Sequence, residues 1–191
     1  MPTPLNELPA VDPDSGRLNV VVDTPKGSRN KYKLDENRGV WRLSKVLPQG
    51  MSFPYDFGYL PGTRGEDGDP VDVLLLMDEP AFAGCVVPAR LIGVFEAEQT
   101  EGGKTVRNDR LVAVVETPYN PAEYRSLEEV NGQRLDEIEH FFIAYNHAEG
   151  REFKPLARRG ADHAAKVLGE EMEGGGHSRN GPKRTGVRGK K

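Results

Sequence analysis

The sequence has few cysteines and no long hydrophobic segment, and each absence excludes a class of protein. Its only cysteine, Cys85, has no disulfide partner within the chain, which excludes an internal disulfide scaffold and predicts a reducing compartment, the cytoplasm. Apolar runs such as Val73–Met77 do not exceed five residues, whereas a membrane-spanning helix needs about 20. Residues 1–14 are polar and rich in proline, which argues against a secretory leader. We therefore expect a protein that is not embedded in a membrane.

Negative charge dominates the chain except at its C-terminal end. The 191 residues include 26 Lys and Arg against 30 Asp and Glu, a net charge of −4. Residues 174–191 contain six basic and no acidic residues, which leaves the rest of the chain at −10. A body this acidic repels phosphate backbones, so we expect no nucleic-acid binding by the main domain. It can still bind phosphate locally if metal ions bridge the like charges.

Three segments of different composition follow one another. Residues 1–16 contain four prolines and no periodicity, which predicts a flexible N-terminal lead-in. Residues 17–172 carry the hydrophobic patterns of a folded domain. Residues 173–191 contain three consecutive glycines and then the basic run, and they cannot bury enough apolar surface to fold. We expect a disordered basic tail there.

The hydrophobic periodicity predicts strands first and helices afterwards. Between residues 18 and 116, short apolar or alternating runs are separated by Gly and Pro turns, a pattern typical of an antiparallel barrel or sandwich. These runs are Leu18–Asp23, Lys31–Leu34, Val40–Leu43, Val73–Met77, Arg90–Ala97 and Arg110–Glu116. One face of a first predicted helix carries Leu135, Ile138, Phe142 and Tyr145. A second helix is expected over Ala161–Glu171 with a stop at Gly174, so the fold class is mainly β with flanking helices (α+β).

The most informative stretch is an acidic turn over Asp67–Asp72, directly before an apolar run. Its three aspartates fall within six residues, and carboxylates this close repel one another unless a cation lies between them. Such oxygen ligands suit Mg²⁺ or Mn²⁺ rather than soft metals. A solvated acidic loop is the alternative, whereas a calcium-binding EF-hand loop lacks its required spacing. The position of Asp72 favours a metal site over a solvated loop, since a charge that enters an apolar strand is costly unless it is paired or binds a cation.

Four motifs follow one another between about residues 18 and 168. The acidic turn continues into a strand, so that Asp67–Val73 reads Asp-Gly-Asp-Pro-hydrophobic-Asp-hydrophobic. It is preceded by the segment Val22–Tyr32 with its lysines and by the aromatic segment Phe53–Tyr59, and it is followed by His140–Tyr145. In sequence and in order, these motifs resemble those of the family I soluble inorganic pyrophosphatases.

The resemblance implies a fold, a reaction and a set of site residues. The implied fold is an OB-like five-stranded β-barrel with two helices packed on it. The implied reaction is the Mg²⁺-dependent hydrolysis of pyrophosphate to two orthophosphates by a metal-activated water, with Mn²⁺ as an alternative ion, in a homo-oligomer. By the resemblance, Asp67 and Asp72 hold the metals, and Asp69 orients or deprotonates the attacking water. The residues implied to bind phosphate oxygens are Lys31, Lys45 and Tyr145.

Several positions depart from the family pattern. Asp23 stands where a Glu is usual and is predicted to be a shorter metal ligand. Lys45 replaces an Arg, which loses the bidentate geometry of a guanidinium. Lys33 occupies a position usually held by an acid, and we interpret it, like Arg42, as a surface charge. Two further departures replace tyrosines by Phe53 and Phe57.

A later family motif, two aspartates and a lysine, is also altered. Aligned through Leu111–Val114, Asn108 falls on the second aspartate and Arg110 on the lysine, so we predict a metal ligand and a substrate-binding residue. The two alternate on one strand face. Asp109 is expected to face away unless a bulge shifts the register. Candidates for the remaining family positions are Glu98 or Glu101 for the first aspartate, and Lys154 for the lysine that Asn146 replaces.

Two other functions stay open at this point. A divergent family member would hydrolyse another phosphoanhydride or a phosphate ester. A non-enzymatic OB-fold module for single-stranded nucleic acid would need exposed aromatic side chains along a basic groove. The acidic body makes this second alternative the weaker one.

Overall fold

The computed structural model describes residues 4–116 and 123–176. Its helices are the short 3₁₀ helices η1 (Leu5–Glu7) and η2 (Leu127–Glu129) and the α-helices α1 (Gly132–Ala148) and α2 (Ala161–Gly176). Its strands are β1 (Leu18–Thr24), β2 (Asn30–Asp35), β3 (Val40–Val46), β4 (Asp56–Tyr59), β5 (Asp72–Leu76), β6 (Val86–Glu101), β7 (Lys104–Arg107), β8 (Arg110–Val115) and β9 (Glu152–Gly160).

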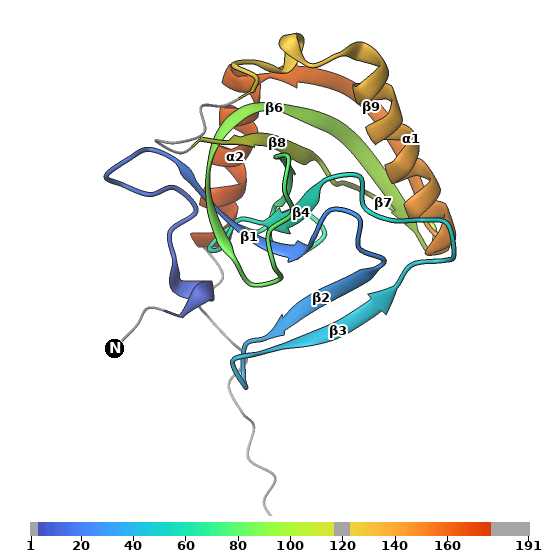
Figure 1. The fold of residues 1–191 in the computed structure, drawn as a ribbon, viewed down its shortest axis with the longest axis horizontal. Helices are drawn as coiled ribbons and strands as arrows, with labels where there is room; N and C mark the ends of the chain where they lie inside the picture. Colours follow the sequence, from blue (N-terminus) through green and yellow to red (C-terminus); the bar gives the residue numbers. More distant parts are fainter. Residues whose placement is uncertain (1–3, 117–122, 177–191) are drawn as a thin grey trace, which may run out of the picture.

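Five strands close into a ring. Each strand pairs with the next in the order β1–β4–β5–β8–β6, and β6 pairs back with β1, with Leu18 opposite Ala89 and Val21 opposite Val86. The pairs are antiparallel except β5–β8, which is parallel. Closure pairs both edges of every ring strand. The ring is visible at the centre of Figure 1 and confirms the five-stranded OB-like barrel.

Three strands escape prediction from periodicity. β4 and β7 have only four residues each. β9 carries charged residues and a proline, and it pairs with the outer part of β6 from Gly93 to Thr100 with a register shift after Glu96. Strands β2 and β3 form a separate hairpin beside the ring, with exposed positions on both faces of β3. The long strand β6 therefore pairs with strands of the ring and also with β9, which lies outside the ring.

Both predicted helices are confirmed. α1 packs against β9 and α2 against β6, and the two lie at different sides of the ring in Figure 1. The buried residues of α1 include Leu135, Ile138, Phe142 and Tyr145, the predicted apolar face. α2 runs to Gly176, so the expected stop at Gly174 is wrong. A glycine costs a helix only about 1 kcal/mol relative to alanine, so it does not by itself end a helix.

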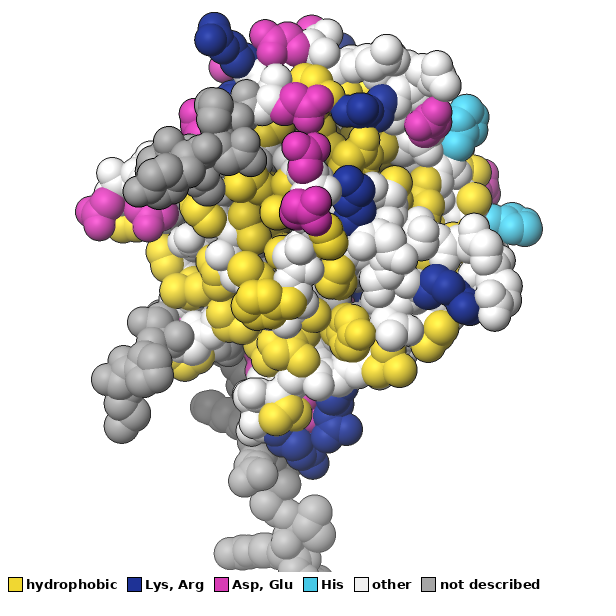
Figure 2. Space-filling model, in the orientation of Figure 1, with side chains coloured by type: hydrophobic (Ala, Val, Ile, Leu, Met, Phe, Trp, Pro, Cys, Tyr) yellow, Lys and Arg dark blue, Asp and Glu magenta, His cyan; other side chains and the backbone are white. Residues whose placement is uncertain are grey.

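The core has an aromatic part and an aliphatic part. The aromatic part includes Phe53, Phe57, Phe142 and Phe153, and it extends from the ring to α1. The aliphatic part is built mainly from ring strands and includes Leu168 of α2. Figure 2 shows further hydrophobic side chains at the surface of the viewed face, between acidic side chains near its top and Lys and Arg side chains near its lower end.

One residue of the predicted lead-in belongs to the core. Ala10 is only 3% exposed, and its carbonyl oxygen accepts a hydrogen bond from the backbone N–H of Asn19. Val11 forms an isolated bridge with Leu18. Most of the predicted basic tail, residues 177–191, lies outside the described residues. The domain boundaries at residues 16 and 172 stay predictions.

Candidate active site

A cavity of about 510 Å³ lies between the β2–β3 hairpin and the acidic turn. Its charged lining includes the acids Asp23, Asp69 and Asp72 and the cations Lys31, Lys33 and Arg64. Lys31 and Lys33 are two residues apart on β2, so their side chains leave the same face of the strand. The cavity therefore brings charges of both signs from β1, β2, β5 and the turn to one place.

The acidic turn owes its shape to Gly68. The backbone there has φ of +88°, which glycine adopts without the steric cost of a side chain. Asp67 Oδ1 then accepts a hydrogen bond from the backbone N–H of Asp69 at 3.0 Å. The side chain of Asp69 points into the open cavity and is 69% exposed. Its exposure is compatible with a group that meets water and substrate.

Buried Asp23 and partly buried Lys31 form an ion pair at one wall of the cavity. Lys31 Nζ lies 3.6 Å from Asp23 Oδ2 and 4.6 Å from the centroid of the Phe57 ring. Burial raises the pKa of Asp23, although Lys31 and a hydrogen bond from Thr24 oppose it. Burial lowers the pKa of Lys31, but the charges of Asp23 and Asp72 outweigh it and raise the pKa. Lys31 is therefore held as a cation, as binding a phosphate oxygen requires.

Asp72 is paired with Arg110. The Arg110 Nη1 lies 3.0 Å from Asp72 Oδ2 and also donates to the side-chain oxygen of Asn108. Arg110 is only 4% exposed, and its guanidinium carbon lies 5.6 Å from the Phe142 ring centroid. Asn108 donates in turn to Gln99 Oε1 at 3.0 Å. The structure thus brings together the predicted residues Asp72, Asn108 and Arg110, with the Asn108 amide oxygen directed to Arg110.

A second, smaller cavity of about 20 Å³ lies beside Asp72 and collects further acids. Asp67, Asp109 and Glu171 line it together with Asp72. Burial raises the pKa of Asp67, and the charges of Asp72 and Asp69 raise it further. Burial also raises the pKa of Glu171, helped by the charges of Glu66, Asp109 and Asp67. These carboxylates repel one another, as the sequence predicted for the turn.

Asp109 and Glu171 are acids of this region that the sequence did not predict. Strand alternation places Asp109 on the far face, but residues 108 and 109 lie between β7 and β8, outside either strand. Asp109 Oδ1 accepts a hydrogen bond from the backbone N–H of Ala97 at 2.9 Å. Glu171 comes from α2, and its position beside the turn depends on packing that has no local sequence signal.

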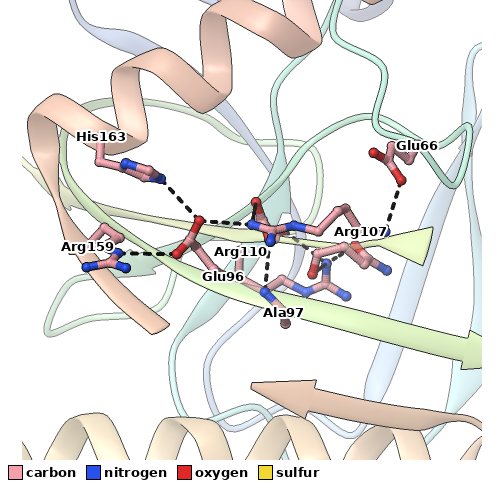
Figure 3. A network of polar contacts seen from close by, with 9 residues as sticks. Glu66, Glu96, Ala97, Arg107, Arg110, Arg159 and His163 are labelled. Carbon is pink, nitrogen blue, oxygen red and sulfur yellow. Dashed lines mark hydrogen bonds and ion pairs between the residues drawn. The ribbon is translucent and has the colours of Figure 1, made fainter. Parts of the chain in front are cut away.

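A polar network outside the ring supports this region (Figure 3). Its centre is Glu96 of β6, whose side chain is 14% exposed. Glu96 Oε1 accepts from Arg107 at 3.0 Å and contacts His163 Nε2 at 3.1 Å, while Oε2 accepts from Arg159 at 3.3 Å. The network therefore joins β6, β7, β9 and α2.

Arg107 connects this network to the acids of the smaller cavity. Its Nη2 also donates to Asp109 Oδ2 at 2.9 Å. Its backbone N–H donates to Glu66 Oε2 at 3.1 Å, one residue before Asp67. Arg107 thus fixes Asp109 and the start of the acidic turn relative to β7 (Figure 3).

Other predicted residues take different places. Lys45 pairs with Glu149, just after α1. Tyr145 is 7% exposed, and its ring centroid lies 5.4 Å from that of Phe53, within the aromatic core. Lys33 is 73% exposed, in agreement with its interpretation as a surface charge, and it also lines the large cavity. Glu98, Glu101 and Lys154 line neither cavity and form ion pairs elsewhere, with Glu98 bound to Lys154 at 3.5 Å.

The donor set fits a hard divalent cation in its chemistry. Asp67 and Asp72 offer carboxylate oxygens to the same cavity. Burial is the main reason that the pKa of Asp67 is raised, and the charges of Asp72 and Asp69 add a repulsion that a cation would relieve. Over residues 4–116 and 123–176, however, no three His, Cys, Asp or Glu side chains are assembled in the geometry of a metal site. Arg110 supplies the positive charge beside Asp72.

Neither α1 nor α2, nor any other helix in the described part of the chain, is long and apolar enough to span a membrane.

Comparison with known sequences identifies relatives over most of the chain. The sequence profile described as Inorganic pyrophosphatase matches residues 20–174. The inorganic pyrophosphatase of Synechocystis sp. is 35% identical over 166 residues, which cover 87% of this chain and 95% of that protein. The inorganic pyrophosphatase of Corynebacterium glutamicum is 40% identical over 132 residues, which cover 69% of this chain and 80% of that protein.

Solved structures show the same similarity in three dimensions. An inorganic pyrophosphatase from Neisseria gonorrhoeae matches with a TM-score of 0.79 at 30% identity, covering 90% of this chain and 99% of that one. The enzyme from Helicobacter pylori matches with a TM-score of 0.78 at 32% identity, covering 87% and 97%. With the barrel, the acidic turn and the matched profile in agreement, the chain belongs to the inorganic pyrophosphatase family.

Proposed function

We propose that the chain hydrolyses inorganic pyrophosphate to two orthophosphates with the help of Mg²⁺. The observation that carries the proposal is the cavity that sets the partly buried, charged Lys31 opposite the acids of the turn. Pyrophosphate is a small anion of high charge, so a site that hydrolyses it needs fixed cations as well as groups that accept or donate a proton. The family match supports the same activity and implies a divalent cation.

The residues of the chain take distinct roles in this proposal. Asp67 and Asp72 hold the divalent cation, with Asp23 and Asn108 as further ligands. When bound, such a cation neutralises charge on the diphosphate and makes water more acidic. Asp69, exposed in the cavity, orients the attacking water and accepts its proton. The residues proposed to bind phosphate oxygens are Lys31, Lys45, Arg110 and Tyr145.

Besides this proton transfer, the reaction needs positioning and charge stabilisation from the protein. The water oxygen forms a bond to one phosphorus while the bond from that phosphorus to the bridging oxygen breaks. The negative charge that develops on the leaving phosphate is stabilised by the cationic side chains. Lys31 suits this role because its position between Asp23 and the Phe57 ring is fixed before substrate arrives.

A substrate panel tests the proposal against the alternative of another phosphoanhydride or a phosphate ester. The full chain is incubated with pyrophosphate, ATP, polyphosphate or a phosphate monoester, with Mg²⁺, with Mn²⁺ and with a chelator. We expect orthophosphate release chiefly from pyrophosphate and only with a divalent cation. Faster release from any other substrate in the panel would replace the proposed function by the alternative one.

Three further properties belong to the proposal. A homo-oligomer is supported by exposed hydrophobic side chains on β3, where Val40, Leu43 and Val46 are 44%, 56% and 55% exposed. Cytoplasmic location is supported by the single cysteine. The acidic body disfavours nucleic acid as a partner of the main domain. Light scattering of the purified chain tests the first of these.

A further inference from the structure

Lys33 is a cation of the large cavity with no role in the function proposed above. It follows Lys31 by two residues on β2, so the two side chains leave the same strand face from Cα atoms about 7 Å apart. Both line the cavity. A diphosphate carries charge on both of its phosphates, so two cations at this spacing can each meet one of them.

Lys33 also contacts the residue proposed to act on water. Its Nζ lies 3.6 Å from Asp69 Oδ1, and the two side chains are 73% and 69% exposed. An ion pair this exposed to water is weak. A multiply charged phosphate can therefore replace Asp69 as the partner of Lys33. Lys31 differs, because its partner Asp23 is buried and the pair is fixed.

We propose that Lys33 is a further substrate-binding residue that exchanges Asp69 for a phosphate oxygen when the substrate binds. The exchange has two consequences. It adds a charged hydrogen bond to the bound diphosphate, and it frees the Asp69 carboxylate to face water at the moment it is needed. This inference rests on the proposed function, since the ligand of Lys33 is the same diphosphate.

The binding test uses methylenediphosphonate, which resembles pyrophosphate but has no bridging oxygen to hydrolyse. Calorimetric titration of the full chain with this probe, at fixed Mg²⁺, compares wild type with Lys33→Gln and Lys33→Arg. We expect Lys33→Gln to weaken binding at least about tenfold, near the lower end of what one hydrogen bond to a charged group contributes. Lys33→Arg keeps the charge and should recover most of the affinity. The KM for pyrophosphate should follow the same order, with unchanged thermal unfolding.

Arg42→Gln is the matched control. Arg42 is the cross-strand partner of Lys33, carries the same charge and pairs with Asp35 at 3.0 Å, outside the lining of the cavity. We expect it to bind the probe within twofold of wild type. Equal loss in both variants would mean that only the net charge of the hairpin matters, and wild-type affinity in Lys33→Gln would mean that Lys33 does not bind the diphosphate. Either result overturns the inference.

A double-mutant cycle tests the exchange itself. If Asp69 competes with the diphosphate for Lys33, then Asp69→Asn should tighten binding of the probe at least twofold in the wild-type background. In the Lys33→Gln background the same change should have no effect on binding. Equal effects in the two backgrounds would contradict the exchange. Failure of the proposed function is separate, because it appears as absent pyrophosphate hydrolysis by the wild-type chain.

Discussion

Asp72 and Arg110 show how a charged residue is kept at the edge of a buried strand. Arg110 is almost fully buried, and Asp72 at 3.0 Å is its acidic partner. Removing one member of such a pair leaves the other without compensation, which costs more than the pair contributes. Tests at Asp72 therefore need the amide variant, which keeps the size of the side chain and an oxygen for Arg110.

Tyr145 combines a place in the core with a predicted role at the substrate. Its ring packs on Phe53, and Lys31 Nζ lies 5.8 Å from the centroid of the same Phe53 ring. Tyr145→Phe keeps the ring, so we expect the free energy of unfolding to change by no more than about 1 kcal/mol. If the hydroxyl binds a phosphate oxygen, the KM for pyrophosphate should rise several-fold. An unchanged KM would remove Tyr145 from the substrate-binding set.

At the residue scale, sequence reasoning finds the groups that lie in motifs and misses those that depend on packing. The sequence is enough to predict the candidate site residues Asp67, Asp69 and Asp72, because they lie in one short turn and all three carry carboxylates. The position of Lys33 beside the cavity depends on where the hairpin lies relative to the acidic turn, which no local pattern encodes. Asp109 was misjudged because strand alternation does not apply between β7 and β8.

At the element scale, the close approach of β1 and β4 depends on one glycine. A Cβ placed on Gly58 would clash with the backbone oxygen of Val21, and a backbone atom cannot move aside as a side chain can. We expect Gly58→Ala to lower the free energy of unfolding by about 3 kcal/mol or more.

The same substitution in α2 provides the control. A Cβ on Gly169 would meet no other atom within 4 Å, and alanine favours a helix over glycine by up to about 1 kcal/mol. Gly169→Ala should therefore raise the melting temperature while Gly58→Ala lowers it. Similar shifts in both variants, measured by calorimetry, would contradict the described packing of β1 on β4.

The Glu96 network joins four elements and gives stability a defined dependence on pH. Burial raises the pKa of Glu96, but hydrogen bonds from Arg107, His163 and Arg159 outweigh it, so the net pKa lies below its ordinary value of 4.5. A lowered pKa means that the ionised carboxylate stabilises the fold above that ordinary value. This contribution is lost as the pH falls through the pKa of the folded state.

Glu96→Gln tests this dependence. We expect the variant to be less stable than wild type at pH 7, by about 1–3 kcal/mol for the loss of charged hydrogen bonds. The difference should shrink as the pH falls below the ordinary value of 4.5 and through the lowered pKa of the folded state, because wild-type Glu96 then becomes neutral as well. Denaturant unfolding at a series of pH values measures it. A difference that does not change with pH would show that Glu96 is not ionised in the folded protein.

At this scale, periodicity predicted the elements with clear apolar patterns and missed the short or irregular ones. The apolar strands β1, β5 and β8 and the amphipathic helix α1 bury one or both faces, so their patterns are clear. β9 alternates only in part, because it pairs with the outer stretch of β6. The strand β9 is stabilised by its packing against α1, a tertiary contact that its sequence pattern does not predict.

At the scale of the whole molecule, ring closure brings the site together. β1 carries Asp23 at one end, β5 begins with Asp72, and the hairpin β2–β3 covers the space between them. No local pattern specifies that β6 returns to pair with β1. The family resemblance predicted this closure, whereas composition and periodicity left a barrel and a sandwich equally open.

The most direct measurement is orthophosphate release from pyrophosphate by the full chain and its Asp72→Asn variant, each with saturating Mg²⁺. The account predicts release by the wild type that stops when Mg²⁺ is chelated, and a loss of at least about 100-fold in the variant, the scale of one electrostatic group at a reacting phosphate. Circular dichroism confirms that the variant is folded. Release by the folded variant at the wild-type rate, or release by the wild type in the presence of chelator, would contradict the account.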